Sequence, residues 1–147
     1  MNILAVDPGT EKSAWVILHN ENIVRMGIDE NSHVLKILSE TIVDTVVIEM
    51  IASYGMAVGK EVFETCVWIG RFIQACDGNS PVERIFRHEI KMYLCGNTRA
   101  KDSNIRQALL DRYGPPGTKK APGKLYGIKK DMWAALAVAV TFQDRVQ

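Results

Sequence analysis

The clearest indication of the fold is Ile3-Leu4-Ala5-Val6-Asp7-Pro8-Gly9-Thr10, near the beginning of the sequence. Its four consecutive apolar residues predict a strand buried on both faces, and the Asp-Pro-Gly-Thr sequence predicts a tight turn directly after it. A second apolar run, Thr45-Val46-Val47-Ile48, is rich in β-branched residues and is followed by Glu49. Such a run is typical of a central strand covered on both faces. Each of the two expected inner strands therefore ends on a carboxylate.

The remaining elements follow from the periodicity of the apolar residues. Residues 14–18 and 23–26 predict two strands that form an antiparallel meander with the first strand, and residues 82–86 predict a fifth. Ser32 is expected to cap a short helix that runs to about Ser39. Further helices are expected over residues 58–76, 87–94 and 101–113, and from about residue 130 onwards. This order of elements predicts an α/β fold, with a mixed five-stranded sheet flanked by helices.

Length and composition indicate one ordinary globular domain. The 147 residues fit a single domain over 1–147, and 47% hydrophobic with 24% charged residues disfavours a disordered or repetitive chain. No apolar run approaches the roughly 18 to 20 residues of a membrane span, and no secretory leader is visible, so we expect no membrane association and a cytoplasmic location. The three cysteines form no Cys-x-x-Cys pair, which favours reduced, structural thiols over disulfides or a zinc site.

The net charge of +1 hides a strong asymmetry along the chain. Residues 84–130 contain twelve basic and three acidic residues, a net charge of +9, whereas the rest of the chain carries −8. Within this segment, a loop at about 114–128 is rich in glycine and proline and is expected to be exposed and mobile. It contains Lys119, Lys120 and Lys124. The segment predicts a surface that meets a polyanion, although basic helices with simply solvated faces would give the same pattern.

Three carboxylates interrupt apolar elements and are the candidate functional groups. Asp7 and Glu49 end the two inner strands, and Asp131 stands at the beginning of the last expected helix. If those strands are neighbours, Asp7 and Glu49 lie side by side, which is electrostatically unfavourable unless a cation is bound. Such hard oxygen ligands suit Mg²⁺ or Mn²⁺. The simpler alternatives are that Asp7 caps the turn before Gly9 and that Asp131 caps the last helix.

Several motifs, in their order and spacing, resemble the RuvC-type Holliday junction resolvases of the ribonuclease H-like superfamily. They are Val6-Asp7-Pro8-Gly9-Thr10, Val47-Ile48-Glu49-Met50, His88-Glu89-Ile90-Lys91, Ala100-Lys101-Asp102-Ser103 and the segment from Asp131 to Val140. Together they extend over essentially the whole chain. The short length and the segment from Tyr54 to Phe72 resemble the bacteriophage branch of that family.

The resemblance implies a dimeric endonuclease that binds a four-way DNA junction and nicks two opposed strands with Mg²⁺ or Mn²⁺, two ions per active site. It implies metal binding by Asp7, Glu49 and Asp131. It also implies that Lys101, together with Lys91, approaches the phosphates. One departure concerns the last helix, where the family has two metal-binding side chains three residues apart. Here Asp131 matches the first position and Ala134 stands at the second.

Two aromatic features allow a further interpretation. Tyr54 is the one candidate for an aromatic residue that stacks on an unpaired DNA base, and a packing role is an equal alternative. The helix over 58–76 has an expected core stripe at Val58, Val62, Cys66, Ile69, Ile73 and Cys76. It also carries Phe63, Val67, Trp68 and Phe72, so we expect a second apolar face that pairs with the same helix of another copy.

Two other functional classes compete with the nuclease interpretation. Sugar kinases and actin-like proteins also begin with a strand, an aspartate and a Gly-Thr turn, but they need two such domains around a nucleotide cleft, which 147 residues cannot supply. The other class is a non-catalytic relative of the resolvases that binds branched DNA without cutting it. Ala134 makes this second alternative plausible.

Overall fold

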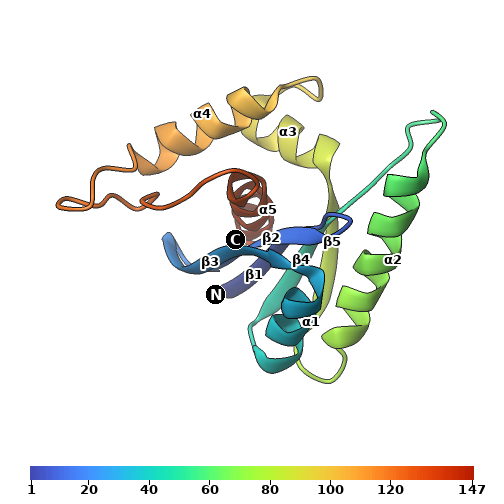
Figure 1. Cartoon of the computed structure of the whole chain (residues 1–147). Helices are drawn as coiled ribbons and strands as arrows, with labels where there is room; N and C mark the ends of the chain where they lie inside the picture. Colours follow the sequence, from blue (N-terminus) through green and yellow to red (C-terminus); the bar gives the residue numbers. More distant parts are fainter.

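The computed structural model describes residues 1–147 and has one mixed five-stranded sheet flanked by helices (Figure 1). The strands are β1 (Asn2–Asp7), β2 (Lys12–His19), β3 (Asn22–Glu30), β4 (Thr45–Met50) and β5 (Val82–Phe86). The helices are α1 (Asn31–Glu40), α2 (Lys60–Ala75), α3 (Arg87–Cys95), α4 (Asp102–Tyr113) and α5 (Met132–Val146). The predicted fold class is confirmed. No helix is both long enough and apolar enough to cross a membrane.

The strand order is β3-β2-β1-β4-β5. β1, β2 and β3 form the predicted antiparallel meander, and β4 pairs in parallel with both β1 and β5. The two runs that were expected to be inner strands, β1 and β4, are therefore neighbours. This arrangement places the carboxyl ends of both strands at the same edge of the sheet.

Alternation along the strands divides the interior into two layers. In β1, Ile3 and Ala5 pack with α5, whereas Leu4 and Val6 pack on the opposite side with α1 and α2. Because side chains alternate between the faces of a strand, Asp7 belongs to the α5 side. α5 is buried along most of its length because α3 and α4 pack against it from outside (Figure 1).

The predicted core stripe of α2 is partly wrong. The buried positions of this helix are Thr65, Ile69 and Phe72, so Phe72 belongs to the core and not to a second face. Phe63 and Val67 are each 62% exposed, and Trp68 is half-buried against Phe72. The buried face of α2 therefore differs from the expected stripe. Apolar residues stand on two faces of this helix, and periodicity alone does not tell which of the two faces the sheet covers.

The loop at 114–128 departs from the expectation in one respect. Lys119, Lys120 and Lys124 are exposed as predicted, but Leu125 is completely buried in the core beside α5. The segment also has hydrogen bonds of its own, including a short bridge between Gly117 and Pro122. The loop that carries these three lysines is therefore held to the domain by the buried side chain of Leu125. The glycine and proline content of the loop gave no indication of this contact.

Candidate active site

Asp7 and Glu49 lie side by side at the carboxyl edge of the two inner strands. The parallel pairing of β1 with β4 runs to Val6 opposite Ile48, and the next residue of each strand is the carboxylate. Glu49 follows Val47 by two residues and therefore shares with it the face covered by α5. The sequence places both acids on the same side of the sheet at neighbouring positions.

Burial makes this pair of acids electrostatically unusual. Burial, and then repulsion from Glu49 and Asp131, raise the pKa of Asp7 to about 8. Burial also raises the pKa of Glu49 above its ordinary value, although Arg87 opposes this shift. Two adjacent carboxyls cannot both ionise cheaply in a poorly solvated place, so near neutral pH they retain a proton unless a cation replaces it.

The turn after Asp7 is fixed by two polar residues that the sequence analysis did not single out. Ser13 Oγ accepts a hydrogen bond from the backbone N–H of Gly9 at 3.1 Å and donates one to Asn31 Oδ1 at 2.6 Å. Asn31 Nδ2 in turn donates to the carbonyl oxygen of Gly9 at 2.9 Å. A Cβ at position 9 would lie 2.3 Å from the carbonyl oxygen of Lys12, so the turn needs glycine. Asn31 is buried at the beginning of α1, whereas the expected cap Ser32 is exposed.

Arg87 is the basic residue in direct contact with the carboxylate pair. It begins α3, immediately after β5, and its Nη1 lies 3.3 Å from Glu49 Oε1. Its Nη2 forms an ion pair with Asp102, in the first turn of α4. The guanidinium therefore connects β4 to α4 across the site.

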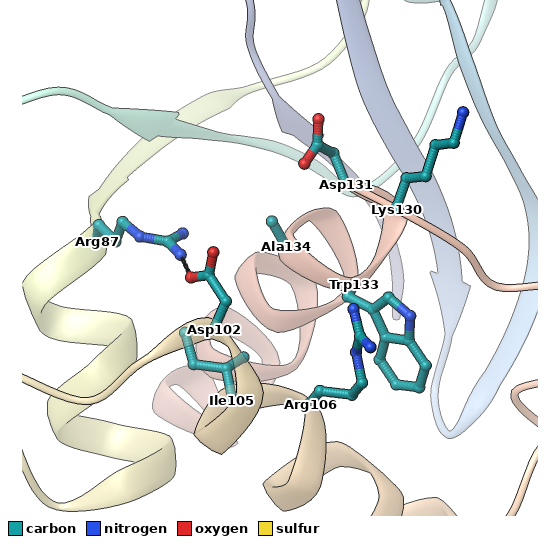
Figure 2. A pocket seen from close by; sticks show the side chains of 8 residues that line it. All are labelled: Arg87, Asp102, Ile105, Arg106, Lys130, Asp131, Trp133 and Ala134. Atoms are coloured by element: carbon teal, nitrogen blue, oxygen red, sulfur yellow. Dashed lines mark hydrogen bonds and ion pairs between the residues drawn. The ribbon is translucent and has the colours of Figure 1, made fainter.

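Asp131 borders a cavity of about 170 Å³ beside this ion pair (Figure 2). The side chain is exposed, and its charge contributes to the raised pKa of Asp7. It makes no capping hydrogen bond to α5, which disfavours the alternative that Asp131 is merely a helix cap. Ala134 lines the same cavity, and Asp102 approaches it from α4 (Figure 2).

A larger groove of about 820 Å³ lies on the other side of Arg87. Glu49, Tyr54 and Lys91 all line it, so two of the predicted DNA-binding residues stand beside a predicted metal ligand. The hydroxyl of Tyr54 is 2.9 Å from Nδ1 of His88, and the tyrosine ring is 59% exposed. Burial raises the pKa of Glu49, and the positive charge of Lys91 in the same groove opposes that shift weakly, after Arg87.

Lys101 has a different position. It is exposed, directly precedes α4, and lines neither the cavity beside Asp131 nor the groove beside Tyr54. The residue of that segment that faces the site is its neighbour Asp102, through Arg87. A role of Lys101 near the phosphates stays a prediction.

The donor set fits a hard divalent cation. Asp7 and Glu49 offer carboxylate oxygens only, and binding a cation would relieve the repulsion that raises their pKa values. Asp131 offers a third carboxylate at the rim. No three acidic, histidine or cysteine side chains converge closely enough to enclose an ion in this conformation, so Asp7, Glu49 and Asp131 do not form a closed three-carboxylate cluster.

Arg87, His88 and Asp102 are the site residues that sequence reasoning missed. Arg87 and His88 follow β5, which pairs with β4 so that Phe86 lies opposite Met50. A residue that follows an edge strand next to an acidic strand end is a signal that could have identified them. Asp102 stands in the motif Ala100-Lys101-Asp102-Ser103, but its contact with Arg87 depends on the packing of α4 and has no local signal.

Comparisons with known proteins agree with the fold. No family model matches the chain, and no curated protein matches its sequence. The structure of Thermus thermophilus RuvC is similar, with a TM-score of 0.74 and 18% identity over 99% of this chain and 96% of that chain. T. thermophilus RuvC in complex with a Holliday junction substrate gives a TM-score of 0.71 at the same identity and coverage. The chain thus has a RuvC-like fold.

Proposed function

We propose that this protein is a metal-dependent endonuclease that binds four-way junctions or related branched DNA and nicks it by phosphodiester hydrolysis. The observation that carries the proposal is the adjacent, poorly solvated Asp7–Glu49 pair, which favours a bound cation or a retained proton. Acidic groups whose pKa values are raised by poor solvation and a charged neighbour are typical of functional sites. The RuvC-like fold supports the same class of activity.

Asp7 and Glu49, with Asp131 at the rim, would hold the cation. A divalent ion bound to such carboxylates activates water and stabilises the departing oxygen of a phosphodiester. The residues around them supply the binding surface for DNA. Lys91 presents a positive charge beside Glu49, and Tyr54 presents an exposed ring to the same groove.

Branched DNA is the proposed substrate because the similar fold has been solved with a Holliday junction substrate. The concentration of positive charge in residues 84–130 supports a polyanionic partner independently of that likeness. We further propose that two copies associate through the exposed Phe63 and Val67 of α2, which stand one helical turn apart. We also propose a bacteriophage origin, because the chain length and the segment from Tyr54 to Phe72 resemble the bacteriophage branch of the family.

A non-catalytic branched-DNA-binding protein is the second candidate, and two observations favour it. Ala134 faces the cavity beside Asp131 without offering an oxygen ligand. Arg87 already neutralises part of the charge of Glu49. Under this interpretation, the carboxylate pair would be a remnant of a metal site and the basic surface would carry the function.

The test is nicking of a synthetic four-way junction in Mg²⁺ or Mn²⁺, compared with a duplex of the same sequence. We expect wild-type protein to nick the junction, and we expect Asp7→Asn and Glu49→Gln to bind it as tightly or more tightly without cutting. The neutral variants lose metal affinity and also repel phosphate less. Junction binding without cutting by wild-type protein would favour the second candidate, and cutting by either variant would refute the assignment of the site.

A further inference from the structure

Arg87 lies between the two cavities of the site and lines both of them. It lines the cavity that holds Asp102, Asp131 and Ala134, and it also lines the groove that holds Glu49, Tyr54 and Lys91. Figure 2 shows its guanidinium pointing across the smaller cavity toward Asp102. DNA that passed from the groove to Asp131 would have to pass this guanidinium.

The two ion pairs of Arg87 are unequal in their surroundings. Glu49 has a side chain only 12% exposed and is held in the sheet, whereas the side chain of Asp102 is 81% exposed. An ion pair with an exposed partner contributes little to stability, whereas separating a buried carboxylate from its cation is costly. Arg87 can therefore release Asp102 much more readily than Glu49.

Asp102 also keeps favourable surroundings without Arg87. It stands in the first turn of the 12-residue helix α4, where the backbone N–H groups and the helix dipole favour a negative charge. Water reaches most of its side chain. Losing the arginine leaves neither a buried charge nor an unsatisfied group at Asp102.

A guanidinium donates N–H groups to phosphate oxygens as it does to carboxylate oxygens, and its several donors can serve two different anions at once. A DNA phosphate that reached the cavity beside Asp131 would compete with Asp102 for Nη2 of Arg87. With Nη1 remaining on Glu49, the arginine would connect the phosphate to the strand that carries the carboxylate pair.

We propose that Arg87 is a substrate-binding residue that takes a DNA backbone phosphate in exchange for Asp102 while it keeps its contact with Glu49. In the free protein, Asp102 occupies the place of the phosphate. The proposal rests on the proposed function, because it assumes that DNA is the ligand of this site. It adds the residue that orients the backbone at the carboxylates and an acid that competes with the DNA for it.

The test measures binding of a fluorescent four-way junction by anisotropy at several KCl concentrations, in EDTA so that no cutting occurs. For Arg87→Gln, we expect the slope of log affinity against log salt to become shallower by about 0.9, the value of one phosphate contact. For Asp102→Asn, we expect binding about two- to fivefold tighter, since the competitor for Arg87 is an exposed ion pair. In the double variant, the gain from Asp102→Asn should fall to the smaller gain that the loss of one negative charge gives by itself.

Matched controls separate this exchange from general charge effects. Arg25→Gln removes an exposed arginine of β3, at the opposite edge of the sheet, and should leave the salt slope unchanged. Asp111→Asn removes an exposed acid of the same helix as Asp102 and should tighten binding less than Asp102→Asn. Thermal melting checks that each variant is folded, and the exposed Asp102 variant tests the exchange even if Arg87→Gln is unstable.

Three outcomes would overturn the proposal. An unchanged salt slope in folded Arg87→Gln would show that Arg87 contacts no phosphate. An equal gain from Asp102→Asn with and without Arg87 would show that Asp102 acts only through its charge. Absence of any DNA binding by wild-type protein would overturn the proposed function as well, whereas binding without metal-dependent cutting would refute only the catalytic activity and leave the salt slopes as the test of Arg87.

Discussion

Asn31 Nδ2 donates a 2.9 Å hydrogen bond to the carbonyl oxygen of Gly9, so the first residue of α1 holds the turn that follows Asp7. The amide is buried, and its oxygen accepts a hydrogen bond from Ser13. Asn31 thus connects α1 to both ends of the β1–β2 turn. This connection fixes the backbone just after Asp7, because Gly9 is only two residues away.

Asn31→Ala should therefore lower both stability and cutting. Removing the amide leaves the hydroxyl of Ser13 and the carbonyl of Gly9 without their partner, at a cost of about 1 to 3 kcal/mol. Thermal melting measures the loss of stability, and the junction assay measures the loss of cutting. Ser32→Ala, at the exposed neighbouring position, is the control and should behave like wild-type protein. If Asn31→Ala were as stable as that control, the turn after Asp7 would not depend on the hydrogen bonds of Asn31.

The pH dependence of stability should reveal the proton held by Asp7. Its pKa is about 8 in the folded protein against a usual value of 3.8, so between these values the folded state binds a proton that the unfolded state has lost. Stability of the metal-free protein should therefore fall as pH rises from about 4 to about 8, with a slope of up to about 1.4 kcal/mol per pH unit for one proton.

Asp7→Asn isolates this contribution because it removes the titrating group. Its stability should fall less steeply over the same pH range, as measured by urea unfolding in EDTA at several pH values. Asp77→Asn, in the exposed turn after α2, is the control. Mg²⁺ should stabilise wild-type protein more at pH 8 than at pH 6, since the ion and the proton compete for one pair of carboxyls. A pH profile identical for wild type and Asp7→Asn would contradict the prediction.

The sequence predicted the fold and the acidic pair because both depend on short-range patterns. Continuous apolar runs indicated β1 and β4, and their parallel pairing brings Asp7 beside Glu49 once the two strands are neighbours. The contact between Glu49 and Arg87 joins residues 38 positions apart and depends on how α3 leaves β5. No local pattern contains that information. The burial of Leu125 and the buried face of α2 were missed for the same reason, since both are decided by packing against distant elements.

The basic loop should supply charge and little geometry. Replacing Lys119, Lys120 and Lys124 together by Ala should weaken binding to all DNA shapes and make its salt dependence shallower, because all three are exposed. The measurement is the salt slope of anisotropy titrations with junction and duplex. A triple variant with the wild-type salt slope would mean that the three loop lysines contact only solvent.

Lys101→Ala should instead slow cutting more than it weakens binding if the lysine approaches the phosphates.

Association through α2 should depend on its exposed apolar residues. Val67→Glu introduces a charge at a position that is 62% exposed in the monomer, so the fold should tolerate it while a dimer through this face should not. Sedimentation at micromolar concentration should show a dimer for wild-type protein and a monomer for the variant. Ile42→Glu, at another exposed apolar residue outside α2, is the matched control. A monomeric wild-type protein would refute the proposed dimer, and a Val67→Glu dimer would place its interface elsewhere.

The last helix offers a direct test of how many carboxylates the site uses. Asp131 and Ala134 are three residues apart and line one cavity, so an acid at position 134 would face the same space. If Asp131 is the third oxygen ligand, Asp131→Asn should weaken Mn²⁺ binding and reduce cutting. Ala134→Asp should strengthen Mn²⁺ binding and allow the second ion that the family resemblance implies. Calorimetric titration measures both the affinity and the number of ions bound. Asn22→Asp, which adds a negative charge on β3, at the far edge of the sheet from β5, controls for the general attraction of cations. Asp131→Asn with wild-type metal affinity and cutting would show that Asp7 and Glu49 bind the ion without the last helix.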